Sequence, residues 1–220
     1  MLREEAKWLA NSIYSLDSQT VFPLLNIGSS SQDFRKKKQP WIDKFLFKSA
    51  REQGYSVIHT DLKNDGGVDL IGDLSNPAFL QKISELKIKS VLCSNLLEHL
   101  LSKEQICQKI SSIIPIDGYL FVTVPYQFPL HRDPIDTLFR PNVTELSKLF
   151  PELEIVRGEI ICGGRLFQST AVHPILYLVV MIIRLMLPIY QPWRWLDSLR
   201  YSLWLFRNIS ATCIVFKKTH

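Results

Sequence analysis

Residues 22–34 read FPLLNIGSSSQDF, a short apolar run followed by one glycine and three serines. Two structures fit this stretch. It is either a buried strand that ends in an ordinary turn, or a strand followed by a cofactor loop that has lost most of its glycines. The segments that follow along the chain decide between the two.

Short strand-like runs alternate with helix-like runs from residue 21 to residue 149. Apolar side chains recur at helical spacing over residues 41–53, which end at Gly54, and helices are also expected over 79–86 and 98–113. Strands are expected at 24–28, 55–62, 68–74, 90–94, 118–125, 153–161 and 211–217. The alternation predicts an α/β fold, a sheet of parallel strands covered by helices.

The composition fits one domain with a sizeable core, because the chain has 220 residues, of which 46% are hydrophobic. The net charge of +5 suits an anionic partner, which could be nucleic acid, a phosphorylated substrate or an acidic membrane surface. The positive charge is spread out and no aromatic-basic recognition module is present, so no nucleic-acid partner is expected.

The four cysteines are widely spaced and form no CxxC pair, which indicates reduced thiols and predicts no metal site. Residues 1–16 carry charges where a signal peptide needs an apolar core, and they predict a short amphipathic helix. A cytoplasmic protein is therefore expected.

Polar residues follow every predicted strand, at the sheet edge where open α/β folds bind ligands. Taken singly, Gly28 could end a strand, Asp61 could cap a turn and Glu98 could be a solvated helix residue. Together they favour a nucleoside cofactor, because an acidic residue after the second strand can hold a ribose diol by charge-assisted hydrogen bonds. The residues after the five strands are Gly28 with Ser29–Ser31; Asp61; Asp73; Asn95, Glu98 and His99; and Tyr126, His131, Asp133 and Asp136.

With these residues at the ends of its predicted strands, the sequence resembles the class I S-adenosylmethionine-dependent methyltransferases, in particular the group called type 11. The resemblance covers roughly residues 20–160 and the last strand, and the LEHL segment at 97–100 is its most specific motif. It implies a Rossmann-like open sheet, mostly parallel with an antiparallel last strand and helices on both faces, and S-adenosyl-L-methionine as cofactor. The motifs are LLNIGSSS, IHTDL, VDLIGDL, VLCSNLLEHL, GYLFVTVPY, HRDPIDTLFRP and ATCIVFKK.

The resemblance also implies the residues that contact the cofactor. Gly28 would let the chain pass the methionine portion, and Asp61 would bind the ribose hydroxyls. Asp73 and Leu74 would lie against the adenine. Asn95 would lie beneath the sulfonium, with Leu96 near it.

The first motif departs from the family pattern. Asn26 stands where the family has an acidic residue, and Ser30 stands where it has another glycine. Asn26 and Ser30 are both expected to belong to the cofactor site, but the protein is expected to bind the cofactor more weakly than proteins with the family motif do. A non-catalytic methyltransferase-like binding or scaffold protein at the membrane surface is therefore the alternative function.

Methyl transfer mainly requires that donor and acceptor are positioned, and a general base is needed only where the acceptor must lose a proton. His131 is the expected base, with Asp133 and Asp136 orienting it or binding substrate hydroxyls, whereas His99 is interpreted as structural. The expected acceptor is a small molecule, a glycan or a lipid-linked compound. The basic run 35–38 is interpreted as a solvated loop, with contact to an anionic substrate group as the alternative.

The predicted domain comprises residues 1–161 and 209–220, and residues 162–208 form an apolar helical insertion. Its apolar stretch, 172–189, contains Arg184 and Pro188, and a single crossing would separate two strands of one sheet. Peripheral contact of 166–208 with the inner membrane face is favoured, because the segment is rich in tryptophan and basic residues. A helical lid and a homodimer contact are the alternatives.

Overall fold

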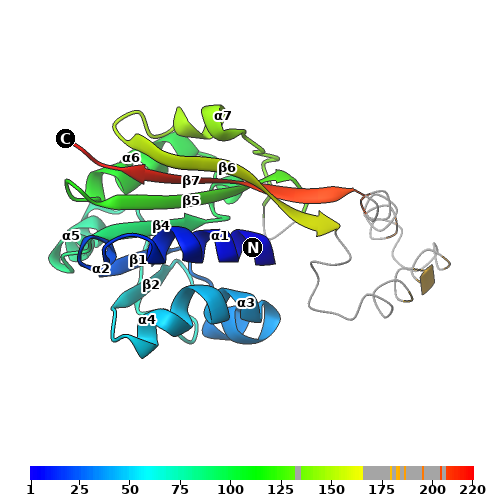
Figure 1. The fold of residues 1–220 in the computed structure, drawn as a ribbon, viewed down its shortest axis with the longest axis horizontal. Helices are drawn as coiled ribbons and strands as arrows, with labels where there is room; N and C mark the ends of the chain where they lie inside the picture. Colours follow the sequence, from blue (N-terminus) through cyan, green and yellow to red (C-terminus); the bar gives the residue numbers. More distant parts are fainter. Residues whose placement is uncertain are drawn as a thin grey trace.

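The computed structural model describes residues 1–131, 135–165 and 207–220, together with a few single positions between 179 and 204. Within this part of the chain, seven strands form one mixed sheet in the order β3-β2-β1-β4-β5-β7-β6 (Figure 1). The strands are β1 (Leu24–Ile27), β2 (Val57–Asp61), β3 (Leu70–Ile71), β4 (Ser90–Ser94), β5 (Tyr119–Gln127), β6 (Glu154–Arg165) and β7 (Asn208–Lys217).

The first five strands are parallel to one another, and β7 is antiparallel to both of its neighbours, β5 and β6. The predicted fold is confirmed, including the antiparallel last strand. Strands β6 and β7 extend further than predicted, because they pair as far as Arg165 opposite Asn208.

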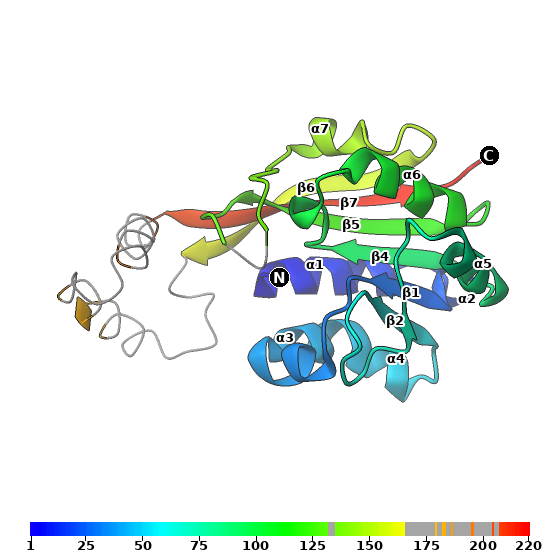
Figure 2. The same cartoon turned by 180° about the vertical axis from the view of Figure 1, so that it is seen from behind.

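Helices cover both faces of the sheet, as Figures 1 and 2 show from opposite sides. Helices α1, α3 and α4 pack on one face, where the core includes Trp8 and Leu46, and α5, α6 and α7 pack on the other, where it includes Phe79 and Ile110. The helices are α1 (Arg3–Tyr14), α2 (Ser18–Val21), α3 (Pro40–Ile42), α4 (Lys48–Glu52), α5 (Pro77–Glu85), α6 (Lys103–Ile113) and α7 (Val143–Ser147).

Alternate residues of the central strands enter the two cores. Leu120 and Val122 of β5 face α5 and α6, whereas Phe121 faces α1. A strand buried on both faces needs apolar residues at consecutive positions, which explains the continuous apolar run of this segment.

The helix predicted over 98–113 is divided into a 3-10 turn, Leu97–His99, and helix α6. The carbonyl of Glu98 accepts hydrogen bonds from both the N–H and the hydroxyl of Thr137, each at 2.9 Å. A carbonyl bonded in this way does not form the hydrogen bond that would continue an α-helix. A contact distant in sequence therefore ends the turn and fixes the position of Glu98.

No helix in the described part of the chain is long and apolar enough to span a bilayer. The insertion predicted at 162–208, and with it the membrane, lid and dimer alternatives, lies outside the described residues apart from its two ends and a few single positions.

Candidate functional site

A cavity of about 120 Å³ lies at the carboxyl ends of β1, β2 and β3, beside the turn that follows β4. Its walls are mostly apolar, with the carboxylates of Asp61 and Asp73 among them. Five of the eight residues predicted to contact a cofactor line this cavity, namely Gly28, Asp61, Asp73, Leu74 and Leu96. The other lining residues are Ile27, Thr60, Leu62, Gly72, Leu100 and Ile106.

Gly28 ends β1 with a φ of 65°, in the left-handed region that favours glycine. A Cβ atom at this position would lie 3.0 Å from Cδ1 of Leu96. The only glycine of the first motif therefore stands where both the backbone conformation and a close neighbour require it.

Asp61 shapes the loop after β1 as well as lining the cavity. Its Oδ2 accepts a hydrogen bond from the N–H of Ser30 at 2.8 Å, and its Oδ1 accepts one from the N–H of Lys63 at 3.1 Å. Each carboxylate oxygen keeps a second lone pair for a ligand hydroxyl. Ser30 adopts a φ of 55° and is not among the residues that line the cavity, so its observed contact is with Asp61.

Arg35 also stabilises the loop after β1. Its guanidinium donates hydrogen bonds to the carbonyls of Ser29, Ser30 and Gly67, and the residue is only 4% exposed. Burial lowers its pKa. The interpretation of the basic run as a solvated loop is wrong for Arg35, while the three lysines that follow it are exposed.

Asn26 does not face the cavity. Its side-chain N–H group lies 3.0 Å from Nδ1 of His59, the residue opposite it on β2. An amide nitrogen only donates, so Nδ1 of His59 is the acceptor. Burial lowers the pKa of His59 to about 4, which keeps this imidazole neutral.

Asn95 adopts a φ of 50°, and its side chain donates to Oε1 of Glu5 at 2.7 Å. Glu5 belongs to α1, is buried, and also accepts hydrogen bonds from the Thr123 hydroxyl and the Leu2 N–H. The sequence analysis did not identify Glu5, because a charged residue on an amphipathic helix is normally solvated. The residues that hold it lie about 90 and 118 positions away.

The loop after β5 carries a second polar group beyond the cavity. Nδ1 of His131 lies 3.1 Å from Oδ2 of Asp136, and Arg140 binds both oxygens of Asp136. Burial alone would raise the pKa of Asp136, but hydrogen bonds from Arg140 and from the N–H groups of His131 and Leu138 lower it to about 2. Burial lowers the pKa of His131. Asp133, predicted to act beside them, lies outside the described residues.

Glu98 is fully buried, which excludes the alternative that it is a solvated helix residue. Neither carboxylate oxygen has a hydrogen-bond partner among the described residues. Burial raises its pKa to about 8. Nε2 of His99 lies 3.7 Å from Oε1 of Glu98, and the ring of His131 lies against that of His99, with ring centroids 5.2 Å apart.

No family model matches the sequence, and no curated protein is significantly similar to it. Solved structures share the fold. Coclaurine N-methyltransferase bound to N-methylheliamine and S-adenosylhomocysteine is 14% identical, with a TM-score of 0.53 over 95% of this chain and 71% of that chain. A methyltransferase from Anabaena variabilis is 12% identical, with a TM-score of 0.51 over 98% of this chain and 86% of that chain. The [4+2]-cyclase SpnF is 13% identical, with a TM-score of 0.52 over 98% and 80%.

At such low sequence identity, the structural similarity shows a shared fold alone. This fold is that of many S-adenosylmethionine-dependent methyltransferases. Because one of the similar proteins is a cyclase, the fold by itself does not determine the reaction.

Proposed function

We propose that this protein is an S-adenosylmethionine-dependent methyltransferase that acts on a small-molecule, glycan or lipid-linked acceptor. The observation that carries the proposal is the cavity after β1–β3, lined by five of the residues that the family motifs assign to the cofactor. Coclaurine N-methyltransferase, which shares the fold, was solved with the demethylated cofactor bound.

The residues of the cavity fit an adenosyl group. Leu62, Leu74 and Ile106 supply apolar walls for a flat base, and Asp61 supplies acceptor lone pairs for a ribose diol. Gly28 leaves room for the ligand and for Leu96 at the first turn. When bound, S-adenosylmethionine supplies a methyl group activated by a sulfonium.

His131 is the proposed general base toward the acceptor. Because burial lowers its pKa, the imidazole is neutral near pH 7 and able to accept a proton from an acceptor hydroxyl. Asp136, held by Arg140, accepts a hydrogen bond from the backbone N–H of His131 and lies 3.1 Å from Nδ1 of its ring. An ionised Asp136 also stabilises the imidazolium that forms when His131 takes up this proton.

One observation favours the non-catalytic alternative. The cavity of about 120 Å³ is smaller than the roughly 300–1,000 Å³ typical of ligand pockets. A binding or scaffold protein that keeps the fold fits such a small site, and cofactor binding therefore has to be measured directly.

Calorimetric titration of the full chain with S-adenosylhomocysteine tests the proposal. We expect saturable binding that is weakened at least tenfold in Asp61→Ala and is unchanged in Asp33→Ala, whose exposed carboxylate pairs with Lys37 and with no other described cation. Thermal unfolding of each variant checks that it is folded. Absence of binding at millimolar ligand, or equal binding by Asp61→Ala, would favour the non-catalytic alternative.

The proposed peripheral membrane contact is tested separately. We expect the full chain to sediment with anionic liposomes and a chain lacking residues 166–206 to remain in the supernatant. Equal partitioning of the two proteins would exclude a membrane role for the insertion, leaving a lid or a homodimer contact, which sedimentation of the protein alone distinguishes.

A further inference from the structure

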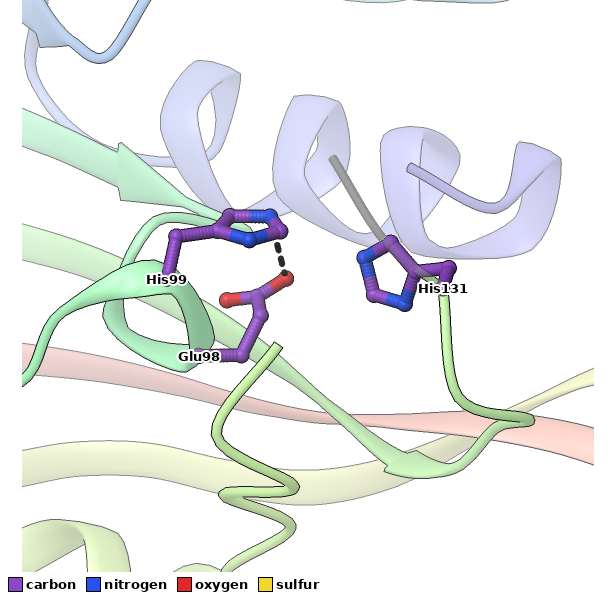
Figure 3. A group of neighbouring side chains, drawn as sticks. All are labelled: Glu98, His99 and His131. Carbon is purple, nitrogen blue, oxygen red and sulfur yellow. Dashed lines mark ion pairs between the residues drawn. The ribbon is translucent and has the colours of Figure 1, made fainter. Parts of the chain in front are cut away.

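Three potential metal ligands meet between the ends of β4 and β5. One ligand atom each of Glu98, His99 and His131 lies within 4.8 Å of the other two. Figure 3 shows the Glu98 carboxylate next to the His99 ring, with the His131 ring facing both. Glu98 and His99 come from the turn after β4, whereas His131 comes from the loop after β5, so no short sequence motif contains all three.

Each histidine has its Nδ1 close to an oxygen atom outside the cluster. Nδ1 of His99 bonds to the carbonyl of Ile135, which only accepts, so Nδ1 carries the proton and Nε2 has a free lone pair. Nδ1 of His131 lies 3.1 Å from Oδ2 of Asp136 without forming a hydrogen bond among the described residues, so only the negative charge of Asp136 favours a proton on Nδ1 and leaves Nε2 as the ligand. Histidines that bind metals usually donate their other ring N–H to a carbonyl or a carboxylate, as His99 does here.

The carboxylate of Glu98 is the independent observation that indicates a cation. The residue is 0% exposed, and neither of its oxygens has a hydrogen-bond partner among the described residues. Buried carboxylates are ordinarily paired, hydrogen-bonded or bound to a metal. The nearest nitrogen, Nε2 of His99, carries a lone pair rather than a proton in the tautomer that Ile135 selects, so it does not donate to Glu98.

We propose that Glu98, His99 and His131 bind one divalent transition-metal ion through one carboxylate oxygen and two Nε2 atoms. Two imidazoles and one carboxylate suit Zn²⁺ and Fe²⁺, and such sites keep positions open for a substrate oxygen. Tetrahedral ligation with bonds near 2.1 Å places ligand atoms about 3.4 Å apart, so the three side chains close on the ion by roughly 1 Å.

The position of the site suggests what its open positions bind. Glu98 and His99 lie two and three residues after Leu96, which lines the proposed cofactor cavity. An ion here would face the acceptor and lower the pKa of a coordinated hydroxyl. The inferred ligand class is therefore acceptors with a hydroxyl or carboxylate oxygen, and this part rests on the proposed function. In the metal-bound protein His131 would be a ligand rather than a base, and the acceptor hydroxyl, with its pKa lowered by the ion, would lose its proton to solvent.

Cobalt(II) titration of the full, untagged chain, followed by its visible absorption, tests the site without any cofactor. We expect one Co²⁺ per chain, displaced by Zn²⁺, with affinity at least tenfold weaker in Glu98→Gln, His99→Asn and His131→Asn. His220→Asn and Cys162→Ser are the controls, because both remove exposed metal-binding groups outside the cluster. Their affinity should equal that of the wild type.

Asp136→Asn provides a further check, because it leaves all three ligands in place. Loss of the carboxylate beside Nδ1 of His131 should weaken Co²⁺ binding about 10- to 100-fold. Thermal unfolding without metal identifies variants that fail to fold. Glu98→Gln is expected to fold, since it keeps the shape of the side chain and places a neutral group at the buried position.

The metal site is refuted if the wild type binds no Co²⁺, or if folded Glu98→Gln and His131→Asn bind it as tightly as the controls do. Parallel titration with S-adenosylhomocysteine in the presence of a chelator separates this inference from the proposed function. If the protein binds Co²⁺ but does not bind S-adenosylhomocysteine, only the methyltransferase assignment is refuted. If it binds S-adenosylhomocysteine but does not bind Co²⁺, only the metal site is refuted.

Discussion

Hydrogen bonds from Arg35 hold the backbone of the loop after β1, which contains serines where a family member would have flexible glycines. In a glycine-rich version of this loop the backbone adopts a tight turn without strain. Here Ser30 has a left-handed backbone conformation, and the carbonyls of Ser29 and Ser30 accept hydrogen bonds from the Arg35 guanidinium. The contact with Gly67 also ties this loop to the one between β2 and β3. One buried side chain thus links the loop after β1 to the loop after β2.

We predict that Arg35→Met lowers the free energy of unfolding by about 2–4 kcal/mol, because three carbonyls, of which that of Ser29 is buried, lose a charged donor. Lys37→Met is the matched control. Lys37 is exposed and, among the described residues, forms an ion pair with Asp33, so its loss should leave the stability almost unchanged. Urea denaturation measures both, and equal effects would contradict the role given to Arg35.

His59 makes the stability of the folded protein sensitive to acid. Burial, followed by the charge of Arg35, lowers its pKa from 6.5 to about 4 in the folded protein. As the pH falls, the unfolded chain therefore takes up the proton first. The stability that depends on neutral His59 is fully present above pH 6.5 and is lost as the pH falls toward 4.

We predict that the wild type loses up to about 2 kcal/mol more stability than His59→Asn between pH 6.5 and pH 5, from about 1.4 kcal/mol per pH unit. Asparagine keeps an acceptor for Asn26 but does not titrate. Urea denaturation at a series of pH values measures the difference. Parallel pH profiles for the two proteins would show that His59 is not responsible.

At the scale of elements, α1 belongs to the core although it precedes the first strand. Its residues Ala6, Leu9 and Ile13 are buried in the same core as Phe121 of β5. Its Glu5 binds Thr123 of β5 and Asn95 after β4. The helix thus covers one face of the sheet and also fixes the turn from which Glu98 and His99 project.

We predict that Leu9→Ala destabilises the protein by about 2–5 kcal/mol, since the side chain is 0% exposed and its removal leaves a cavity. Leu101→Ala is the same substitution at a residue that is 75% exposed, and it should have an effect within about 0.5 kcal/mol. Chemical denaturation of the two variants provides the comparison. Similar stabilities would mean that α1 is dispensable for the fold.

At the scale of the whole molecule, the proposed cofactor would join elements that are separate in sequence. Its cavity is made by the ends of β1, β2 and β3 and by the turn after β4, so a bound nucleoside stabilises only the assembled sheet.

We predict that S-adenosylhomocysteine at 100 times its Kd stabilises the folded chain by about 2.7 kcal/mol, raising the Tm by roughly 5–10 °C. Differential scanning calorimetry measures the shift, with adenosine at the same concentration as a control that lacks the amino-acid portion. A Tm independent of S-adenosylhomocysteine concentration would contradict binding to the folded state.

The sequence by itself determined the α/β fold and most of the cavity. Strand and helix periodicity are local properties, and in a parallel sheet the residue after a strand must lie at the carboxyl edge. The positions of Gly28, Asp61 and Asp73 in the cavity therefore followed from the chain order. The shortening of β3 to Leu70–Ile71 did not follow, because pairing with β2 decides where that strand ends.

Only the tertiary structure decided which charged residues are buried. Glu5 and Arg35 stand in polar sequence and Glu98 stands in a leucine-rich turn, and each has partners or neighbours far away in the chain. Burial of a charge depends on the free energy of desolvation and on what replaces water, and both are set by the packing of distant elements. For this reason the meeting of Glu98, His99 and His131 is visible in the fold and not in the sequence.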